Sequence, residues 1–327
     1  MASQGERGVP RILGKLENSI KSGNYYEAHQ MYRTLYFRYL GQEKYDDLYQ
    51  MLYNGSILFL EHDQQISGAD LAKLLVDVLV QAGETDVVNW SPKLCNIFSK
   101  IDQSNPERET FMSNVIKWSA KDSPRGNPYL HQCIAEIYWK EKNYSQSRYH
   151  YMLSNDGKSC AKMLIEHHVK HGYRSELDLF ITQAVLQFLS LKNLETANEA
   201  FETYVTLHPW IKRNKTPFCE PLLNFLSFML TVIDKNNFGS FLTLCELYEI
   251  ALKKDPSYAD MIERVGQVFF GIKQREERNQ GGLFGNLMDM LRMRSRDRDS
   301  DSDDDSAFGT SSSSRISSRV LDNTDLD

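Results

Sequence analysis

A short polar break followed by a regular apolar pattern recurs along this chain, and it constrains the fold more than any other feature. Five breaks are each followed by an aromatic residue or leucine, which serves as an anchor: Tyr25, Tyr45, Tyr144, Leu194 and Phe238. Three positions after the anchors we expect inward-facing residues: Ala28, Leu48, Ser147, Ala197 and Phe241. Seven positions after them come further packing residues: Tyr32, Leu52, Tyr151, Phe201 and Cys245. Because positions three, four and seven apart share one helix face, each unit predicts a helix that packs through one stripe.

The first unit, GNYYEAHQMYRTLYFRY (residues 23–39), carries apolar or aromatic side chains on two faces of its predicted helix. One stripe comprises Ala28, Tyr32, Leu35 and Tyr39, and the opposite one comprises Tyr26, Gln30, Arg33 and Phe37. A helix that is apolar on two sides is usually packed between neighbours. We therefore expect Tyr26 and Phe37 to be covered by the next hairpin.

The units resemble tetratricopeptide hairpins, in which two antiparallel helices repeat along the chain. Their anchors are unevenly spaced, so no strict repeat period holds, and no segment shows the sustained alternation of a strand. The sequence therefore predicts an all-α, right-handed solenoid of degenerate tetratricopeptide-like helical hairpins.

Proline-containing loops and changes of composition divide the chain into five parts. Residues 1–8 are expected to be flexible, 9–124 and 125–272 are expected to form two halves of the solenoid, and 273–291 to form a spacer with a short amphipathic segment. Residues 292–327 are charged and serine-rich, a composition that predicts a disordered tail. Ser300 and Ser302 each precede an aspartate by three positions, which predicts phosphorylation by acidophilic kinases.

Composition excludes some classes of protein and some compartments. The formal net charge is −6, whereas nucleic-acid binders are typically basic. The most apolar run, residues 222–233, is shorter than the roughly 20 residues that a membrane-spanning helix needs. No secretory signal is recognisable in the first residues, and five scattered cysteines fit a reducing compartment. We therefore expect a cytosolic protein that binds no nucleic acid and does not insert into membranes.

Catalytic patterns are weak in this sequence. The nearest metal candidate is His167, His168 and His171, with Glu166 or Cys160 as a further ligand, and a packed or solvated histidine cluster is the competing interpretation. Nucleophile motifs and a phosphate-binding loop are missing. We therefore expect neither a cofactor nor an enzymatic activity.

Binding surfaces are the remaining candidates. A local excess of basic residues on the first two predicted helices indicates either a solvated face or a docking face for an acidic partner. The apolar segment 222–228 indicates a buried core helix or a groove for a partner segment. The stripe in 281–291 could dock onto the rest of the chain, bind a partner or touch a membrane, and the last possibility suggests a vesicle-trafficking or membrane-surface adaptor as an alternative function.

Several segments together resemble the animal form of the Golgi to ER traffic protein 4 family, over about residues 13–291. They are residues 23–39, NPERETFMSNVIKWS (105–119), YWKEKNYSQSRYHYMLSNDG (138–157), YRSELDLFITQAVLQFLSLKN (173–193), EPLLNFLSFML (220–230) and the GGLFGNL segment at 281–287. The resemblance implies a non-enzymatic solenoid of the transmembrane-domain recognition complex, which hands tail-anchored membrane proteins to a targeting ATPase for delivery to the endoplasmic reticulum. Beyond Arg292 the chain departs from the family pattern.

The resemblance also implies where partners bind. It places the targeting ATPase on the N-terminal half, with these candidates: Lys15, Lys21, Tyr25, Arg33 and Arg38. It places the ubiquitin-like subunit and the large BAG-domain scaffold, Scythe, on the C-terminal half, where covering a basic localisation segment keeps the scaffold in the cytosol. Such a segment needs an acidic or aromatic-lined groove, for which the candidates are Glu199, Glu202, Tyr204, Trp210 and Glu220.

Overall fold

The computed structural model describes residues 4–120, 123–213 and 215–272, and within these ranges the chain forms helices and no strand. The helices are α1 (Gln4–Lys21), α2 (Tyr25–Leu40), α3 (Tyr45–Glu61), α4 (Gln65–Gln81), α5 (Val87–Lys100), α6 (Glu107–Ser119), α7 (Pro128–Lys140), α8 (Tyr144–Met152), α9 (Gly157–His171), the 3-10 turn η1 (Arg174–Glu176), α10 (Leu177–Ser190), α11 (Leu194–Leu207), α12 (Pro221–Asp234), α13 (Phe238–Leu247), α14 (Glu249–Leu252) and α15 (Ser257–Phe270). The expected all-α class is confirmed. The predicted phosphorylation sites Ser300 and Ser302, the tail and the segment 281–291 lie outside the described residues.

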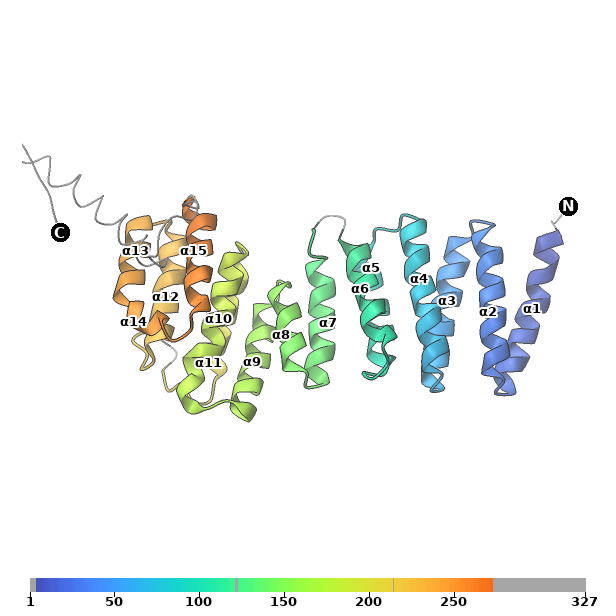
Figure 1. Ribbon diagram of the computed structural model, residues 1–327, viewed down its shortest axis with the longest axis horizontal. Helices are drawn as coiled ribbons and strands as arrows, with labels where there is room; N and C mark the ends of the chain where they lie inside the picture. Colours follow the sequence, from blue (N-terminus) through green and yellow to red (C-terminus); the bar gives the residue numbers. More distant parts are fainter. Residues whose placement is uncertain (1–3, 121–122, 214, 273–327) are drawn as a thin grey trace, which may run out of the picture. The chain divides into compact units, whose positions relative to one another are not determined.

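Helices that follow one another in the chain lie side by side (Figure 1). Each of α3 and α7 packs against the next helix, which makes antiparallel hairpins, and α3, α5 and α7 also contact one another in turn. In the C-terminal part, α9 packs mainly on α11, while α10 contacts α11, α12 and α15. This arrangement confirms the predicted solenoid of helical hairpins.

A common turn joins many of these helices. Each of the five anchors is the first residue of its helix, at the starts of α2, α3, α8, α11 and α13. Two residues earlier the backbone is left-handed, with positive φ at Gly23, Glu43, Lys142, Lys192 and Asn236. In four of the five turns an asparagine follows and its side chain accepts a hydrogen bond from the third backbone N–H of the new helix. The turn therefore reverses the chain and caps the next helix within a few residues.

The packing residues predicted after the anchors are buried, all ten of them. The side chains three and seven positions along each helix make one stripe, so the helix buries a narrow face and leaves the rest to solvent or to the neighbouring hairpin. This part of the sequence pattern is confirmed.

Gly55 allows α3 to approach its neighbours closely. A Cβ atom at this position would lie 2.7 Å from the Tyr32 ring of α2 and 3.0 Å from Leu71 of α4. Because these atoms belong to a packed core, even alanine would push them apart. The Asn-Gly pair at 54–55 is therefore part of a helix interface and not of a turn.

Arg108 of α6 is buried and contacts both α5 and α7. Its side chain is only 3% exposed, and its guanidinium lies 4.2 Å from the Phe98 ring centre and 5.6 Å from that of Tyr138. It also forms an ion pair with Glu141, directly after α7. A charge can be buried in this way because a carboxylate and two ring faces replace its water.

The expected boundary at residue 124 falls in the loop between α6 and α7. The helices on both sides of it nevertheless belong to one compact unit. In α12, Leu222, Leu223, Phe225 and Leu226 are buried, as a core helix requires, whereas Phe228 is 45% exposed.

Candidate interaction surfaces

Three of the five N-terminal candidates are lysine or arginine side chains that reach solvent. Lys15 and Lys21 are exposed on α1, and Arg38 is partly exposed in the last turn of α2. Lys21 and Arg38 also lie at helix C-termini, where the helix dipole favours positive charge. This group of cations is called the basic surface below.

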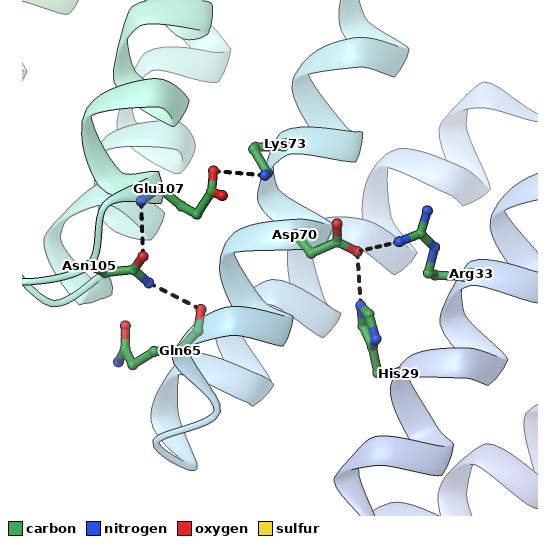
Figure 2. Close-up of polar contacts among 7 residues, drawn as sticks. All are labelled: His29, Arg33, Gln65, Asp70, Lys73, Asn105 and Glu107. Atoms are coloured by element: carbon green, nitrogen blue, oxygen red, sulfur yellow. Dashed lines mark hydrogen bonds and ion pairs between the residues drawn. The ribbon is translucent and has the colours of Figure 1, made fainter.

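Arg33 is not a free cation, because it is bound to a carboxylate of α4 (Figure 2). Its guanidinium donates to Asp70 Oδ2 over 3.3 Å, and His29 Nε2 contacts the same oxygen at 2.9 Å. Arg33 therefore contributes less to a net positive field than the sequence suggested. Asp70 is one of three charged residues of α4, with Lys73 and Asp77, and nothing in the local pattern connects it to Arg33.

The same row of contacts continues from α4 to α6 (Figure 2). Lys73 Nζ and Glu107 Oε2 are 2.8 Å apart, and Asn105 accepts a hydrogen bond from the Glu107 backbone N–H at 3.0 Å. These partly exposed ion pairs tie successive hairpins together.

The aromatic residues of α2 divide differently from what the sequence predicted. The Tyr25 ring packs on α3, with its centre 6.2 Å from that of Phe59 and 5.2 Å from that of His62. Tyr26 and Phe37, by contrast, are 78% and 63% exposed. The expectation that the next hairpin covers them is wrong, because α3 packs on the other stripe of α2. These two rings are the accessible aromatics beside the basic surface.

On the C-terminal side, Tyr204 cannot line a groove. It is fully buried, and its hydroxyl donates to the Leu177 carbonyl oxygen at 2.9 Å. The reason lies in the spacing, since Tyr204 is seven positions after the inward-facing Ala197 and shares its stripe. The prediction for this residue is wrong.

The other four candidates have separate environments. Glu199 pairs with Lys158 at 3.0 Å, and Glu220 is the partly exposed residue that precedes α12. Trp210 packs edge-on against His168, with ring centres 5.0 Å apart. Glu202 lines a groove.

That groove lies between α11 and α12 and has a volume of about 710 Å³. Two carboxylates, Glu202 and Asp234, line it together with the rings of Phe201 and Phe218, which meet edge-to-face at 6.1 Å. Lys215 is the cation among its lining residues. We call this feature the acidic groove. Its acidic and aromatic character agrees with the expectation, although most of the residues that provide it differ from those predicted.

A hydrogen-bonded clamp fixes the wall that carries Phe218. The Asn224 side chain accepts from the Phe218 backbone N–H at 2.8 Å and donates to the Phe218 carbonyl oxygen at 2.9 Å. Both polar groups of one loop residue are therefore satisfied by one residue of α12. The ring position is set by the fold before any partner arrives.

The three histidines of the metal hypothesis do not share one site, because His167 and His171 both lie against Tyr144 whereas His168 does not. His168 is buried and its Nδ1 lies 2.8 Å from His208 Nε2, while His167 stacks on Tyr144 at 4.5 Å. Glu166 is held by Lys142 and Lys170, which lower its pKa to about 2. Burial raises the pKa of the Cys160 thiol. Within the described ranges no three histidine, cysteine or acidic side chains are grouped as a metal site would require.

Comparison with known proteins now decides the family. The sequence model described as Golgi to ER traffic protein 4 matches residues 42–291. The chain belongs to the Golgi to ER traffic protein 4 family. It is 47% identical over 285 residues to the Golgi to ER traffic protein 4 homolog of Oryzias latipes, covering 87% of this chain and 88% of that one. It is 46% identical to the Homo sapiens homolog, with 87% of each chain covered.

The fold agrees with a solved member of the same family. The crystal structure of C. therm. Get4 superposes with a TM-score of 0.75 at 27% sequence identity, and the match covers 88% of this chain and 95% of that one. The family match begins at residue 42, so it contains the acidic groove but neither α1 nor α2. None of the helices that the structure describes is long and apolar enough to cross a membrane.

Proposed function

We propose that this chain is a non-enzymatic adaptor in Golgi to ER traffic that hands tail-anchored membrane proteins to a targeting ATPase. In this proposal the ATPase binds the basic surface of α1 and α2. The BAG-domain scaffold and the ubiquitin-like subunit bind the C-terminal half, and the whole complex works in the cytosol. Family membership supports a role in Golgi to ER traffic. The two charged surfaces support the binding of different partners to the two halves of the chain.

The observation that carries the proposal is that two separate surfaces of opposite charge lie far apart in the chain. Lys15, Lys21 and Arg38 stand on α1 and α2, whereas Glu202 and Asp234 line the groove between α11 and α12. An adaptor that binds two partners at once raises the effective concentration of each for the other. A client helix then passes from chaperone to ATPase with less time in water, and the adaptor need not touch it.

The acidic groove suits a basic segment of the scaffold. Glu202 and Asp234 attract lysine and arginine, and the largely buried Phe201 and Phe218 give the groove an apolar wall for the stems of these side chains. A localisation segment held there is hidden from the nuclear import machinery. The adaptor thereby keeps the scaffold in the cytosol.

Two charge reversals test this division. Lys15→Glu with Arg38→Glu should reduce capture of the ATPase about tenfold and leave the scaffold bound, because rim charges act mainly on encounter. Glu202→Lys with Asp234→Lys should reduce capture of the scaffold and leave the ATPase bound. Co-purification of both partners from cells measures each effect. Loss of both partners in either variant, or of neither, contradicts the two-surface proposal.

Lys162→Glu provides a matched control. Lys162 is an exposed lysine of α9 away from both surfaces, so reversing its charge changes net charge by the same amount per residue. It should leave both partners bound. Loss of the ATPase in this variant would mean that total charge, and not the basic surface, determines binding.

A further inference from the structure

A second cavity opens between α5 and α7, away from the basic surface and the acidic groove. Its volume is about 460 Å³, and Cys95 of α5 and Cys133 of α7 both line it. The remaining lining residues are Asn96, Ser99, Glu136, Ile137, Lys140 and Glu141. Two thiols from neighbouring helices therefore share one solvent-accessible hollow.

The two thiols line the same cavity from packed neighbouring helices and lie close enough for each to shift the pKa of the other. Both are free thiols. Cys95 is buried, while Cys133 is partly exposed toward the cavity. The other three cysteines are also free thiols, and each lies elsewhere: Cys160 and Cys245 are buried, and Cys219 is exposed.

The surroundings of the two thiols differ. The nearby Cys95 thiol and Tyr129 hydroxyl lower the pKa of Cys133, although partial burial and Glu136 oppose the effect. The nearby Cys133 thiol and deeper burial raise the pKa of Cys95 well above its usual value. A thiolate is the reactive form of cysteine, so Cys133 is the nucleophile of the pair and Cys95 the thiol beside it.

We propose that Cys95 and Cys133 form a reversible oxidation site whose substrate is a hydroperoxide. The Cys133 thiolate attacks the terminal OH oxygen of the peroxide, so that an S–O bond forms while the O–O bond breaks. The other oxygen takes a proton from water and leaves as an alcohol or as water. The sulfur is thereby oxidised to a sulfenic acid. Cys95 then loses its proton and attacks the Cys133 sulfur, the S–S bond forms, the S–O bond breaks, and the hydroxyl leaves as water. Two thiols are oxidised by two electrons and one peroxide is reduced.

The disulfide would cross-link α5 to α7 around α6. Cys95 belongs to the 9–124 half and Cys133 to the 125–272 half, so the bond would join the two halves covalently. Closing a chain loop of this length restricts the unfolded state. Oxidation should therefore raise the melting temperature by several degrees and should be reversed by dithiothreitol.

The reduced full-length chain, treated with one equivalent of hydrogen peroxide, tests the proposal. Intact mass should fall by about 2 Da, the mass of two hydrogen atoms, and the thiol count should fall from five to about three. Peptide mapping should find Cys95 linked to Cys133. A gain of about 16 Da or more at Cys133 with Cys95 still free, a bond involving Cys219, or no reaction would each overturn the proposal.

Variants separate the roles of the two thiols. In Cys95→Ser the reaction should stop at a sulfenic acid on Cys133, which dimedone traps, and in Cys133→Ser the residue Cys95 should stay reduced. Cys219→Ser should still lose about 2 Da, because the exposed cysteine takes no part. A disulfide that persists between other cysteines in Cys133→Ser would contradict the assignment. The mass measurement on the unaltered chain does not depend on whether any variant folds.

Discussion

On α1 and α2 the charged side chains stand on open helix faces, whereas Glu202 and Asp234 lie along a groove with aromatic walls. An open charge attracts a partner over several ångströms but is screened by salt. A groove adds shape and removes water from whatever enters it. We therefore expect binding at the basic surface to depend strongly on salt, and binding at the acidic groove to depend mainly on the shape of its walls.

The largest effect is expected from the groove wall. Phe218→Ala removes a ring that is held in place by Asn224, and should weaken binding of a lysine- and arginine-rich peptide by about 2 kcal/mol, or roughly 30-fold. The effect should be similar at low and high salt, since it comes from shape. Fluorescence titration measures it.

Phe228→Ala is the control for that prediction, because Phe228 is a 45% exposed phenylalanine on α12, the helix that follows the Phe218 loop, and does not line the groove. It should change peptide affinity by less than about twofold. If the two variants weaken binding equally, the aromatic wall has no special role and the comparison with the open surface fails.

Acid should loosen α8 and the end of α11 and spare the basic surface. His208 is buried against His168, and burial lowers its pKa to about 4, while His150 is similarly lowered to about 3. Both are neutral in the folded chain but take up protons near their ordinary pKa of about 6.5 when unfolded. Their stabilisation is complete above about pH 6.5 and declines as pH falls toward 4. At pH 5 the loss is about 2 kcal/mol for each histidine.

Hydrogen exchange at pH 7 and pH 5, corrected for intrinsic rates, shows where that stability is lost. Exchange should accelerate more in α8 and α11 than in α2. His150 belongs to α8, and His208 directly follows α11. Uniform acceleration along the chain, or the same protection at both pH values, would show that the buried histidines are not the acid-sensitive element.

The basic surface should respond to salt. Lys15→Gln with Arg38→Gln should weaken ATPase capture about five- to tenfold at low ionic strength, and the difference should nearly vanish at 0.5 M salt, where the Debye length is about 4 Å. Association rates measured by surface plasmon resonance report this effect. Lys162→Gln serves as the control, and a salt-independent loss would mean that these side chains are desolvated on binding.

The sequence predicted helix starts and inward positions well because both depend on local rules. The anchor Leu194 follows an asparagine cap, and positions three and seven after the anchor lie on one helix face, so Ala197 and Phe201 could be placed without the fold. Gly55 and Arg108 could not, because their roles depend on partners in other helices.

The candidate surfaces were harder to predict for the same reason. Arg33 was predicted to be a partner-binding cation, and its pairing with Asp70 could not be foreseen because it joins positions 37 apart in the chain. Asp234 and Phe218 reach the acidic groove from opposite ends of α12, and no local pattern connects them to Glu202. Tyr204 was misplaced although local spacing sufficed, since it continues the stripe of Ala197.

The smallest effect is expected from the ion pair between Arg33 of α2 and Asp70 of α4. Asp70→Asn removes the charge that Arg33 and His29 share, but Arg33 is 42% exposed and Asp70 27%, so water replaces most of what is lost. Unfolding free energy in urea should fall by about 0.5 kcal/mol. A loss above about 2 kcal/mol would show that this pair behaves as a buried one. The distinction between an open charged face and an enclosed groove would then hold for α11 and α12 but not for α2 and α4.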